Sequence, residues 1–394
     1  MKFIAYLLTY AFYPFSFLFI RKKTKYAFGS SLGGFNGNAK SLFIYTCQHK
    51  PEIDAVWLTL SPTTLNQIRS MGLKAYKLSS LPGIWHALTS RYWFFNSYTS
   101  DIMFCFSGGA ICINLWHGVG IKRIEYNITT GPLAKRYQKT DWLDVFYHPQ
   151  SFRKPEYVLS STPFQTHFFS TSFRVDPDVC LPFGYPRNEI LLCPEEERRE
   201  YIERFCGPQA SELLERMLAA RKVLVYMPTW RDSQLSLFTE SMDLGRLDEV
   251  LGRKGDLLLL KPHSNVSAQC EGYEKLSNIV FVKGTVDLYP LLPYTHVLIT
   301  DYSSILYDYI LMPDKDVILY MYDYDEYVAM RDFFYPFDEN VVGSRVYDFN
   351  SLVTLLERDD YRLDAAERRA LVEKFWGDTM THSPSQKLLD YFAG

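Results

Sequence analysis

Short apolar runs separated by longer helical stretches dominate the chain after residue 25. In the first half, KYAFGS, DAVWLTL, LKAYKL, DIMFCF, ICINLWH, DVFYHP and EYVLSS predict strands, and AKSLFIYTCQH predicts a helix capped by Asn38. A second series begins at KVLVYMPTW and continues with DLLLLKPH, IVFVKG, HVLITDYSS and DVILYMYD. Strands that alternate with helices indicate parallel sheets with crossover connections. The pattern therefore predicts an α/β protein.

Two domains of ordinary size suit a chain of 394 residues. A charged, helix-forming segment that is broken by Gly207 and Pro208 separates the two series and is the candidate linker. We expect two Rossmann-like domains that face each other across a cleft. The predicted segments are residues 1–25 (an apolar helix), 26–193 (the first α/β domain), 194–221 (the linker) and 222–394 (the second α/β domain with closing C-terminal helices).

The N-terminal segment MKFIAYLLTYAFYPFSFLFIRKK is apolar over nearly a spanning length and then basic. No small-residue cleavage site of a secretory signal follows it, and tyrosines together with Pro14 interrupt a membrane span. The pattern favours a helix that lies in the membrane interface, with Arg21, Lys22, Lys23 and Lys25 on anionic headgroups. A helix packed on its own domain is the open alternative.

Composition narrows the class of protein. The chain is 47% hydrophobic and 22% charged, which is typical of a globular protein, and its net charge of −3 argues against a general nucleic-acid binder. The seven cysteines contain no CxxC pair, so the sequence indicates neither a zinc site nor a dithiol motif, and reduced thiols of a cytoplasmic protein are expected.

Polar side chains follow several predicted strands directly. Because the carboxyl ends of parallel strands meet at one edge of a sheet, we expect these side chains to converge on a ligand site. The clusters comprise Trp116, His117 and Gly118 with Lys122 downstream; Arg231; Lys261 and His263; and Thr300, Asp301, Ser303, Ser304 and Asp308.

Anion binding and proton transfer are the chemistry that these clusters suggest. Ser303 and Ser304 begin a predicted helix and suit an anion, although helix capping explains serines there equally well. His117 and His263 lie in different predicted domains, which favours one imidazole as a base and the other as a stabiliser of a leaving phosphate. The phosphate-loop, dinucleotide-binding, HExxH and GxSxG motifs are absent from the sequence, which weakens ATP hydrolysis, hydride transfer and serine hydrolysis as functions.

The segments LWHGVGIKRI, FGYPRNEIL, YMPTWRD, LKPHSN and LITDYSSILYDYI occur in an order that resembles the CDP-glycerol glycerophosphotransferase family, which includes teichoic acid primases and polymerases and capsule enzymes. The resemblance implies a glycosyltransferase-B-like fold, with an acceptor-side first domain and a CDP-donor-binding second domain. It also implies transfer of glycerol phosphate or ribitol phosphate from a CDP-linked donor to a hydroxyl of a membrane-linked or polysaccharide acceptor, with release of CMP.

Residue roles follow from the same resemblance. His117 resembles the general base, and His263, Ser303 and Ser304 resemble contacts of the donor diphosphate. Arg187 of the GYPR segment and Arg231 resemble cleft residues. The chain departs from the family pattern at VGIK after WHG, at Arg331 and Asp332, and near the C-terminus, and these departures concern the polyol and acceptor pockets.

We therefore predict an enzyme that works peripherally at the cytoplasmic face of a bacterial membrane, with CDP-glycerol or CDP-ribitol as donor and no tightly bound cofactor or metal. A nucleotide-sugar glycosyltransferase of the same fold is the nearest alternative. A non-catalytic assembly protein of the membrane surface is the second alternative.

Overall fold

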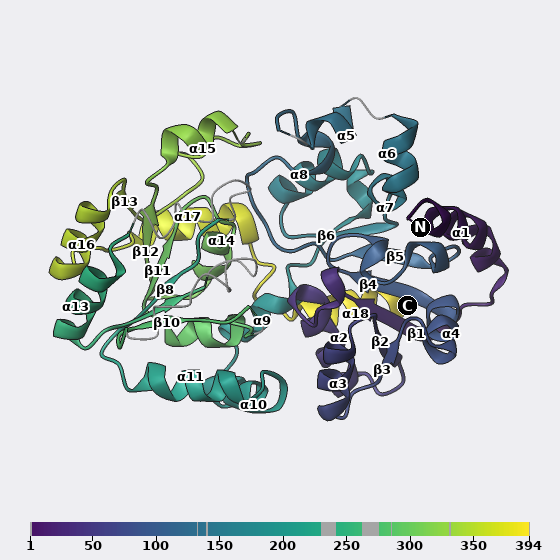
Figure 1. Ribbon diagram of the computed structural model, residues 1–394, viewed down its shortest axis with the longest axis horizontal. Helices are drawn as coiled ribbons and strands as arrows, with labels where there is room; N and C mark the ends of the chain where they lie inside the picture. The colour runs from purple at the N-terminus through teal and green to yellow at the C-terminus, as the bar shows by residue number, and fades with distance from the viewer. Residues whose placement is uncertain are drawn as a thin grey trace. The chain divides into compact units, whose positions relative to one another are not determined.

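The computed structural model describes residues 2–131, 133–138, 141–229, 242–261, 276–284, 286–330 and 332–393. The chain divides into two compact units, residues 1–189 with 375–394, and residues 190–374. Each unit holds one parallel sheet with helices around it (Figure 1). Two boundaries differ from the expected segments: residues 375–394 return to the first unit, and residues 194–221 belong to the second unit.

The sheet of the first unit is parallel throughout its described strands and runs in the order β3-β2-β1-β4-β5-β6-β7. Its strands are β1 (Lys22–Gly29), β2 (Asp54–Thr59), β3 (Ala75–Lys77), β4 (Ser90–Phe95), β5 (Ile111–Asn114), β6 (Tyr157–Ser160) and β7 (Cys180–Pro182). The strand order reverses between β1 and β4. In open parallel sheets, ligands bind beyond the carboxyl ends of the strands at such a reversal.

The helices of the first unit connect these strands and cover the sheet (Figure 1). They are α1 (Lys2–Phe15), α2 (Gly37–His49), α3 (Pro62–Ser70), α4 (Leu81–Thr89), α5 (Ala134–Gln138), α6 (Trp142–Tyr147), α7 (Pro149–Phe152), α8 (Pro163–Phe173) and α18 (Pro384–Ala393), with α9 (Glu189–Leu192) at the boundary between the units. The helix α18 returns to the first unit because its aromatic residues pack on the sheet, where Phe392 contacts Tyr92 and Tyr157.

Two segments that we expected as strands are helical. DIMFCF forms the 3-10 turns η3 (Thr99–Asp101) and η4 (Phe104–Phe106), because the Asp101 carboxylate accepts the N–H groups of Asn96 and Ser97 and turns the chain. DVFYHP belongs to α6, which Asp141 caps by accepting the N–H of Asp144. In both segments a carboxylate satisfies backbone donors that a strand would pair with its neighbour.

The N-terminal helix α1 and the 3-10 turn η1 (Ser16–Leu18) pack against the first unit. Tyr10 stacks on Phe146 of α6 at 5.3 Å between centroids, and Tyr13 stacks on Phe104 at 4.8 Å. Among the helices that the structure describes, none is long and apolar enough to cross a membrane.

Two of the four basic residues expected at the membrane surface lie inside the protein. The Arg21 guanidinium donates to the carbonyl oxygens of Ala87, Ser90, Phe106 and Gly108. Lys25 is buried, and its Nζ donates to Thr89 Oγ1 at 2.7 Å. Lys22 and Lys23 are exposed. The basic cluster therefore anchors the N-terminal segment as well as facing solvent.

The described sheet of the second unit is also parallel, in the order β10-β9-β8-β11-β12-β13. Its strands are β8 (Val223–Tyr226), β9 (Leu257–Leu260), β10 (Ile279–Phe281), β11 (Val297–Thr300), β12 (Asp316–Tyr320) and β13 (Ser344–Val346). The helices are α10 (Glu195–Phe205), α11 (Pro208–Leu218), α13 (Leu244–Lys254), α14 (Ile305–Tyr309), α15 (Tyr324–Met330), α16 (Phe349–Arg358) and α17 (Ala365–Trp376), whose last residues reach the first unit. The strand order reverses between β8 and β11.

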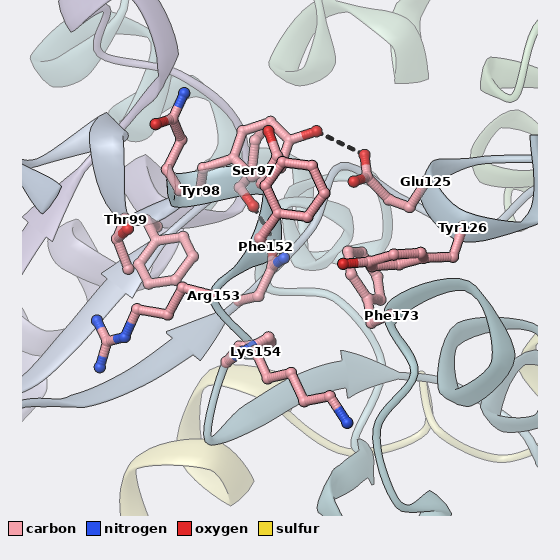
Figure 2. Close-up of a pocket in the computed structure, with 14 residues that line it drawn as sticks. Ser97, Tyr98, Thr99, Glu125, Tyr126, Phe152, Arg153, Lys154 and Phe173 are labelled. Carbon is pink, nitrogen blue, oxygen red and sulfur yellow. Dashed lines mark hydrogen bonds between the residues drawn. The ribbon is translucent and has the colours of Figure 1, made fainter. Parts of the chain in front are cut away.

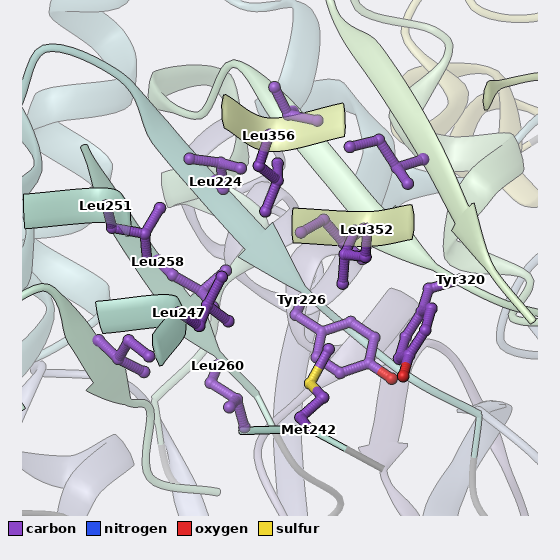
Figure 3. Packing of buried hydrophobic residues seen from close by; sticks show 14 of the residues in the cluster. Leu224, Tyr226, Met242, Leu247, Leu251, Leu258, Leu260, Tyr320, Leu352 and Leu356 are labelled. Carbon is purple, nitrogen blue, oxygen red and sulfur yellow. The ribbon is translucent and has the colours of Figure 1, made fainter. Parts of the chain in front are cut away.

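A leucine-rich core holds the second unit together (Figure 3). Leu247 and Leu251 of α13 and Leu352 and Leu356 of α16 pack on the sheet strands, and all four are at most 3% exposed. Burial of a leucine contributes about 1.5–3 kcal/mol. This core fixes the strands whose carboxyl ends carry the predicted donor residues.

Candidate functional site

The turn after β5 has an unusual backbone that displays His117. Trp116 has a φ of 50° and Gly118 a φ of 113°. Left-handed backbone is rare for a bulky residue and costs about 1–3 kcal/mol, so surrounding contacts must hold it. A φ of 113° is open to glycine and strained for other residues. The sequence Trp-His-Gly therefore builds a sharp turn with the histidine at its centre.

Two asparagine side chains hold this turn. Asn114 Oδ1 accepts the backbone N–H of Trp116 at 2.9 Å. Asn38, which is fully buried in α2, donates to the carbonyl oxygen of Trp116 at 3.0 Å and accepts the backbone N–H of Arg187 at 3.1 Å. Asn38 was expected to cap α2, but the cap residue is Asn36. Asn38 instead ties the strand-end turn to the segment that carries Arg187.

A third asparagine lies where the strand order of the first sheet reverses. Asn96 follows β4, and its Nδ2 donates to Ser30 Oγ after β1 at 2.9 Å and to the Asn36 carbonyl at 3.0 Å. Its Oδ1 accepts the N–H of Ala39 in the first turn of α2. The start of α2 is thus fastened to the carboxyl ends of β1 and β4.

The His117 ring is exposed and lies against the Trp116 indole, with centroids 4.1 Å apart and planes inclined by 29°. The protein mass around the imidazole lowers its pKa below the usual value, and the nearby positive charge of Arg187 lowers it further, whereas a backbone hydrogen bond at Asn96 acts in the opposite direction. A neutral imidazole that solvent reaches is able to accept a proton at neutral pH.

Other residues predicted for the acceptor side lie in the same unit. Arg187 belongs to the 3-10 turn η7 (Pro186–Asn188) and is largely buried. Its charge acts on His117, so the structure brings these two residues together. Lys122 follows on the same segment as His117, and its side chain is partly exposed.

A pocket opens at the carboxyl ends of β4 and β5 in the first unit (Figure 2). The space between its lining residues is about 400 Å³ when the open mouth is included. Its walls combine aromatic rings with polar groups: Phe95, Ser97, Tyr98, Thr99, Asn114, Glu125, Tyr126, Gln150, Ser151, Phe152, Arg153, Lys154, Pro155 and Phe173.

Glu125 is the acidic group of this pocket. Its carboxylate accepts hydrogen bonds from the Tyr98 hydroxyl at 2.6 Å and from the Tyr137 hydroxyl at 2.7 Å. Burial raises the pKa of Glu125, and the two phenolic hydrogen bonds act in the opposite direction. The sequence did not indicate this pocket because its walls come from five separate segments.

In the second unit, the side chains of Thr300 and Asp301 form hydrogen bonds with the backbone of the segment that follows β8. Thr300 Oγ1 donates to the Met227 carbonyl at 2.8 Å. Asp301 is 1% exposed, and both of its carboxylate oxygens accept the backbone N–H of Thr229, at 2.9 and 3.1 Å. Both contacts cross the reversal between β8 and β11 and hold the segment that leads to the TWRD motif.

Lys261 and Asp308 also have partners inside the unit. Lys261 Nζ donates to the carbonyl oxygens of Lys283 and Val286 at 2.6 and 2.7 Å, and burial lowers its pKa to about 8, while Asp287 acts in the opposite direction. Asp308 is fully buried and accepts the Tyr289 hydroxyl at 2.5 Å. These contacts support the strand-end loops, and the predicted donor contacts of Lys261 and Asp308 stay a prediction.

Ser303 and Ser304 are partly exposed at the end of β11. Ser304 is the N-cap residue of α14 but makes no side-chain capping bond, and α14 has five residues, so the dipole support expected there is small. Tyr302 between Asp301 and Ser303 stacks on Tyr327 at 3.9 Å and anchors the segment in the unit. No motif in the sequence indicated this role of Tyr302.

Arg231 and His263 lie outside the described residues, so the predicted contact of His263 with a leaving phosphate stays a prediction. Within the described part of the chain, no cluster of three or more histidine, cysteine or acidic side chains is arranged to hold a metal ion.

Two units, each built on a parallel sheet, make up a fold that is similar to the glycosyltransferase-B type. Among solved structures, the wall teichoic acid polymerase TagF matches with a TM-score of 0.73 and 22% identity, covering 95% of this chain and 89% of that one. A UDP-GlcNAc 2-epimerase from Neisseria meningitidis matches with a TM-score of 0.52 and 12% identity, over 94% of this chain and 98% of that one. These likenesses concern the fold.

The family model for CDP-glycerol:poly(glycerophosphate) glycerophosphotransferases matches residues 11–388. The chain belongs to this family of transferases, as the ordered motifs predicted.

The relatives of this chain differ in the polyol phosphate that their names contain, which is ribitol phosphate or glycerol phosphate. A teichoic acid ribitol-phosphate primase of Bacillus spizizenii is 26% identical over 82% of this chain and 80% of its own length. A teichoic acid glycerol-phosphate transferase of Staphylococcus aureus is 26% identical over 69% of this chain and 67% of its own. A teichoic acid poly(glycerol phosphate) polymerase of Staphylococcus epidermidis is 27% identical over 59% of this chain but 31% of its own length.

Proposed function

We propose that this protein transfers glycerol phosphate or ribitol phosphate from a CDP-linked donor to a hydroxyl of a membrane-linked or polysaccharide acceptor, and releases CMP. The reaction would serve the synthesis of a teichoic acid-like or capsular polymer. The observation that carries the proposal is the exposed imidazole of His117, held on a strained turn in a chain that belongs to the glycerophosphotransferase family.

In the proposed mechanism, His117 acts on the acceptor. The neutral imidazole takes the proton of the acceptor hydroxyl. At the same time, the oxygen of that hydroxyl forms a bond to the phosphorus that bears the polyol. The bond from that phosphorus to the bridging oxygen breaks, and CMP leaves with the electron pair. A pKa below the ordinary histidine value keeps the ring neutral before the reaction, which is the state that a base requires.

The donor side of the proposal uses the second unit. Ser303 and Ser304 are partly exposed and suited to hydrogen-bond diphosphate oxygens, and Asp301 and Thr300 fix the backbone around them. Arg231 and His263 are assigned to the donor by resemblance alone. We expect charge-assisted hydrogen bonds from these residues to lower the barrier as charge grows on the leaving CMP.

The membrane is the proposed location of the acceptor, on the cytoplasmic side. Support comes from apolar side chains of the first unit that face solvent: Phe12, Phe15, Phe17, Leu18 and Ile20 of the N-terminal segment, Leu81 and Trp85 of α4, and Trp142 of α6. Leu18, Leu81 and Trp142 are each more than 70% exposed, and Lys22 and Lys23 are nearby in sequence. Aromatic and basic groups together suit a peripheral contact with anionic lipid.

A nucleotide-sugar glycosyltransferase is the second candidate, because the fold also matches an enzyme of UDP-GlcNAc. Calorimetric titration of the purified protein with CDP-glycerol, CDP-ribitol and UDP-GlcNAc distinguishes the two candidates. We expect binding of a CDP-polyol and none of the sugar nucleotide. Binding of UDP-GlcNAc alone would favour the glycosyltransferase.

A further inference from the structure

We propose that the pocket at the ends of β4 and β5 binds a neutral, hydroxyl-bearing unit of the acceptor, the one next to the hydroxyl that reacts. This inference rests on the proposed function and adds a specificity site to it. Thr99 is the residue that forms a hydrogen bond with a hydroxyl of this acceptor unit.

The place of the pocket supports this assignment. Phe173 lines the pocket, and its ring meets the Trp116 indole edge-on at 5.0 Å between centroids. The same indole also contacts the His117 ring, at 4.1 Å between centroids. Two ring contacts therefore join the pocket wall to the proposed base.

A buried hydroxyl in the pocket wall points to a ligand. Thr99 is 4% exposed, and its Oγ1 makes no hydrogen bond in the structure. Buried hydroxyls nearly always have a partner, and one without a partner destabilises the fold unless something supplies it. In this wall, a ligand hydroxyl supplies that partner.

The acceptor groups of the pocket wall favour a hydroxyl over an anion. Figure 2 shows the Glu125 carboxylate and the Tyr126 hydroxyl directed toward the middle of the pocket. Tyr98 and Tyr137 both donate to Glu125, so this carboxyl group acts as a hydrogen-bond acceptor and offers no donor to a phosphate, although burial raises its pKa. A ligand hydroxyl both donates and accepts, so it satisfies the Thr99 hydroxyl in either direction.

The shape limits what enters. The enclosed part of the pocket has room for about one water-sized group, whereas the open mouth is wider and is lined by Phe152 and the exposed Lys154. We infer that a single hydroxyl or hydroxymethyl group inserts and that the rest of the sugar or polyol unit stays in the mouth.

Thr99→Val tests this assignment, because it keeps the shape of the side chain and removes a hydroxyl without a protein partner. We expect the fold to keep its stability and the KM for the acceptor to rise about three- to tenfold, with kcat and the KM for the CDP-polyol unchanged. Thr46→Val is the matched control. The buried Thr46 hydroxyl donates to the Leu42 carbonyl at 2.7 Å, so this variant should lose stability and keep the acceptor KM.

Acceptor analogues that each lack one hydroxyl identify the group that inserts. One analogue should lose about three- to tenfold in kcat/KM with the wild-type protein and nothing further with Thr99→Val. The inference would be overturned if, for every analogue, the loss in kcat/KM caused by the missing hydroxyl multiplied with the loss caused by Thr99→Val. An unchanged acceptor KM in Thr99→Val would also overturn it, and the pocket would then bind only water. The proposed transfer would survive both results, because wild-type CMP release does not depend on them.

Saturation-transfer NMR tests the pocket independently of turnover. Glycerol and a methyl hexoside are the probes, with inorganic phosphate as a competitor. We expect transfer to at least one neutral probe with the wild-type protein, loss of that signal with Thr99→Val and no competition by phosphate. A signal that persists in the variant, the absence of any wild-type signal, or displacement by phosphate would overturn the assignment.

Discussion

The imidazole of His117 lies on the indole of Trp116 at 4.1 Å between centroids, and Trp116 itself has left-handed backbone. The two facts belong together. The strained backbone of Trp116 turns the chain so that the His117 side chain points away from the end of β5. The Trp116 indole then packs against the His117 imidazole. Strain of this kind persists where surrounding contacts determine the conformation, as Asn38 and Asn114 do in this turn.

Replacement of Gly118 tests the need for this turn. Gly118→Ala adds a Cβ at a φ of 113°, so we expect a loss of about 1–2 kcal/mol of stability and of most transferase activity in the folded protein. Gly72→Ala is the control, because Gly72 also has a positive φ of 75° but lies in the turn after α3 with no atom within 4 Å of the added Cβ. Urea unfolding and CMP release measure the two effects. Equal activity in both variants would contradict the role of the turn.

The asparagine bridge should matter as much as the glycine. Asn38→Ala removes the side-chain hydrogen bonds to the Trp116 carbonyl and from the Arg187 N–H in the interior, which costs about 1–3 kcal/mol and releases the turn. We expect lower stability together with a large loss of kcat. Asn278→Ala, which removes a side-chain bond to the Asp248 carbonyl in the second unit, should lower stability with a much smaller effect on kcat. Chemical denaturation and steady-state kinetics distinguish the two patterns.

The pH profile reports the charge near His117. The pKa of His117 in the folded protein lies below the usual value of about 6.5. We therefore expect kcat/KM to stay constant as the pH falls to about 6.5 and to decrease only at lower pH, where His117 becomes protonated. Arg187→Met removes a positive charge that lowers this pKa, so the acid limb should move to higher pH. Arg174→Met, whose guanidinium lies over the Tyr126 ring, is the control and should leave the limb in place. An unmoved limb in Arg187→Met would count against His117 as the titrating base.

Membrane binding depends on the exposed apolar side chains of the N-terminal segment. Phe17→Ser with Leu18→Ser removes two large groups that are 57% and 76% exposed, and we expect clearly weaker sedimentation with vesicles that contain phosphatidylglycerol. Activity on a water-soluble acceptor should stay unchanged. Leu218→Ser, at a position 46% exposed in the second unit, is the control. Equal vesicle binding by the wild type and the double variant would place the membrane contact elsewhere.

Much of the fold could be predicted because its strands are short apolar runs. The segments VLVY, LLLL and VLIT are fully buried strands β8, β9 and β11, and Thr229, Lys261 and Asp301 follow them in the described part of the chain. The ordered motifs also predicted the family correctly.

Tertiary contacts explain what the sequence did not predict. Asn38 has the local pattern of a helix cap, but its partners are residues about 80 and 150 positions away in the chain. Arg21 and Lys25 have the pattern of a basic surface cluster, yet carbonyl oxygens and a threonine hydroxyl bind them inside the unit. Single-sequence patterns report local preferences, and these side chains respond to distant partners.

Release of CMP by the wild-type protein and by His117→Ala tests the central claim most directly. Both proteins are incubated with CDP-glycerol or CDP-ribitol and a short acceptor, and their far-ultraviolet spectra and unfolding curves are compared. We expect acceptor-dependent CMP release by the wild type and a loss of at least about a hundredfold in the variant, with the fold retained. Wild-type turnover in His117→Ala would contradict the assignment of the base, and no release by the wild type with either donor would contradict the proposed transfer.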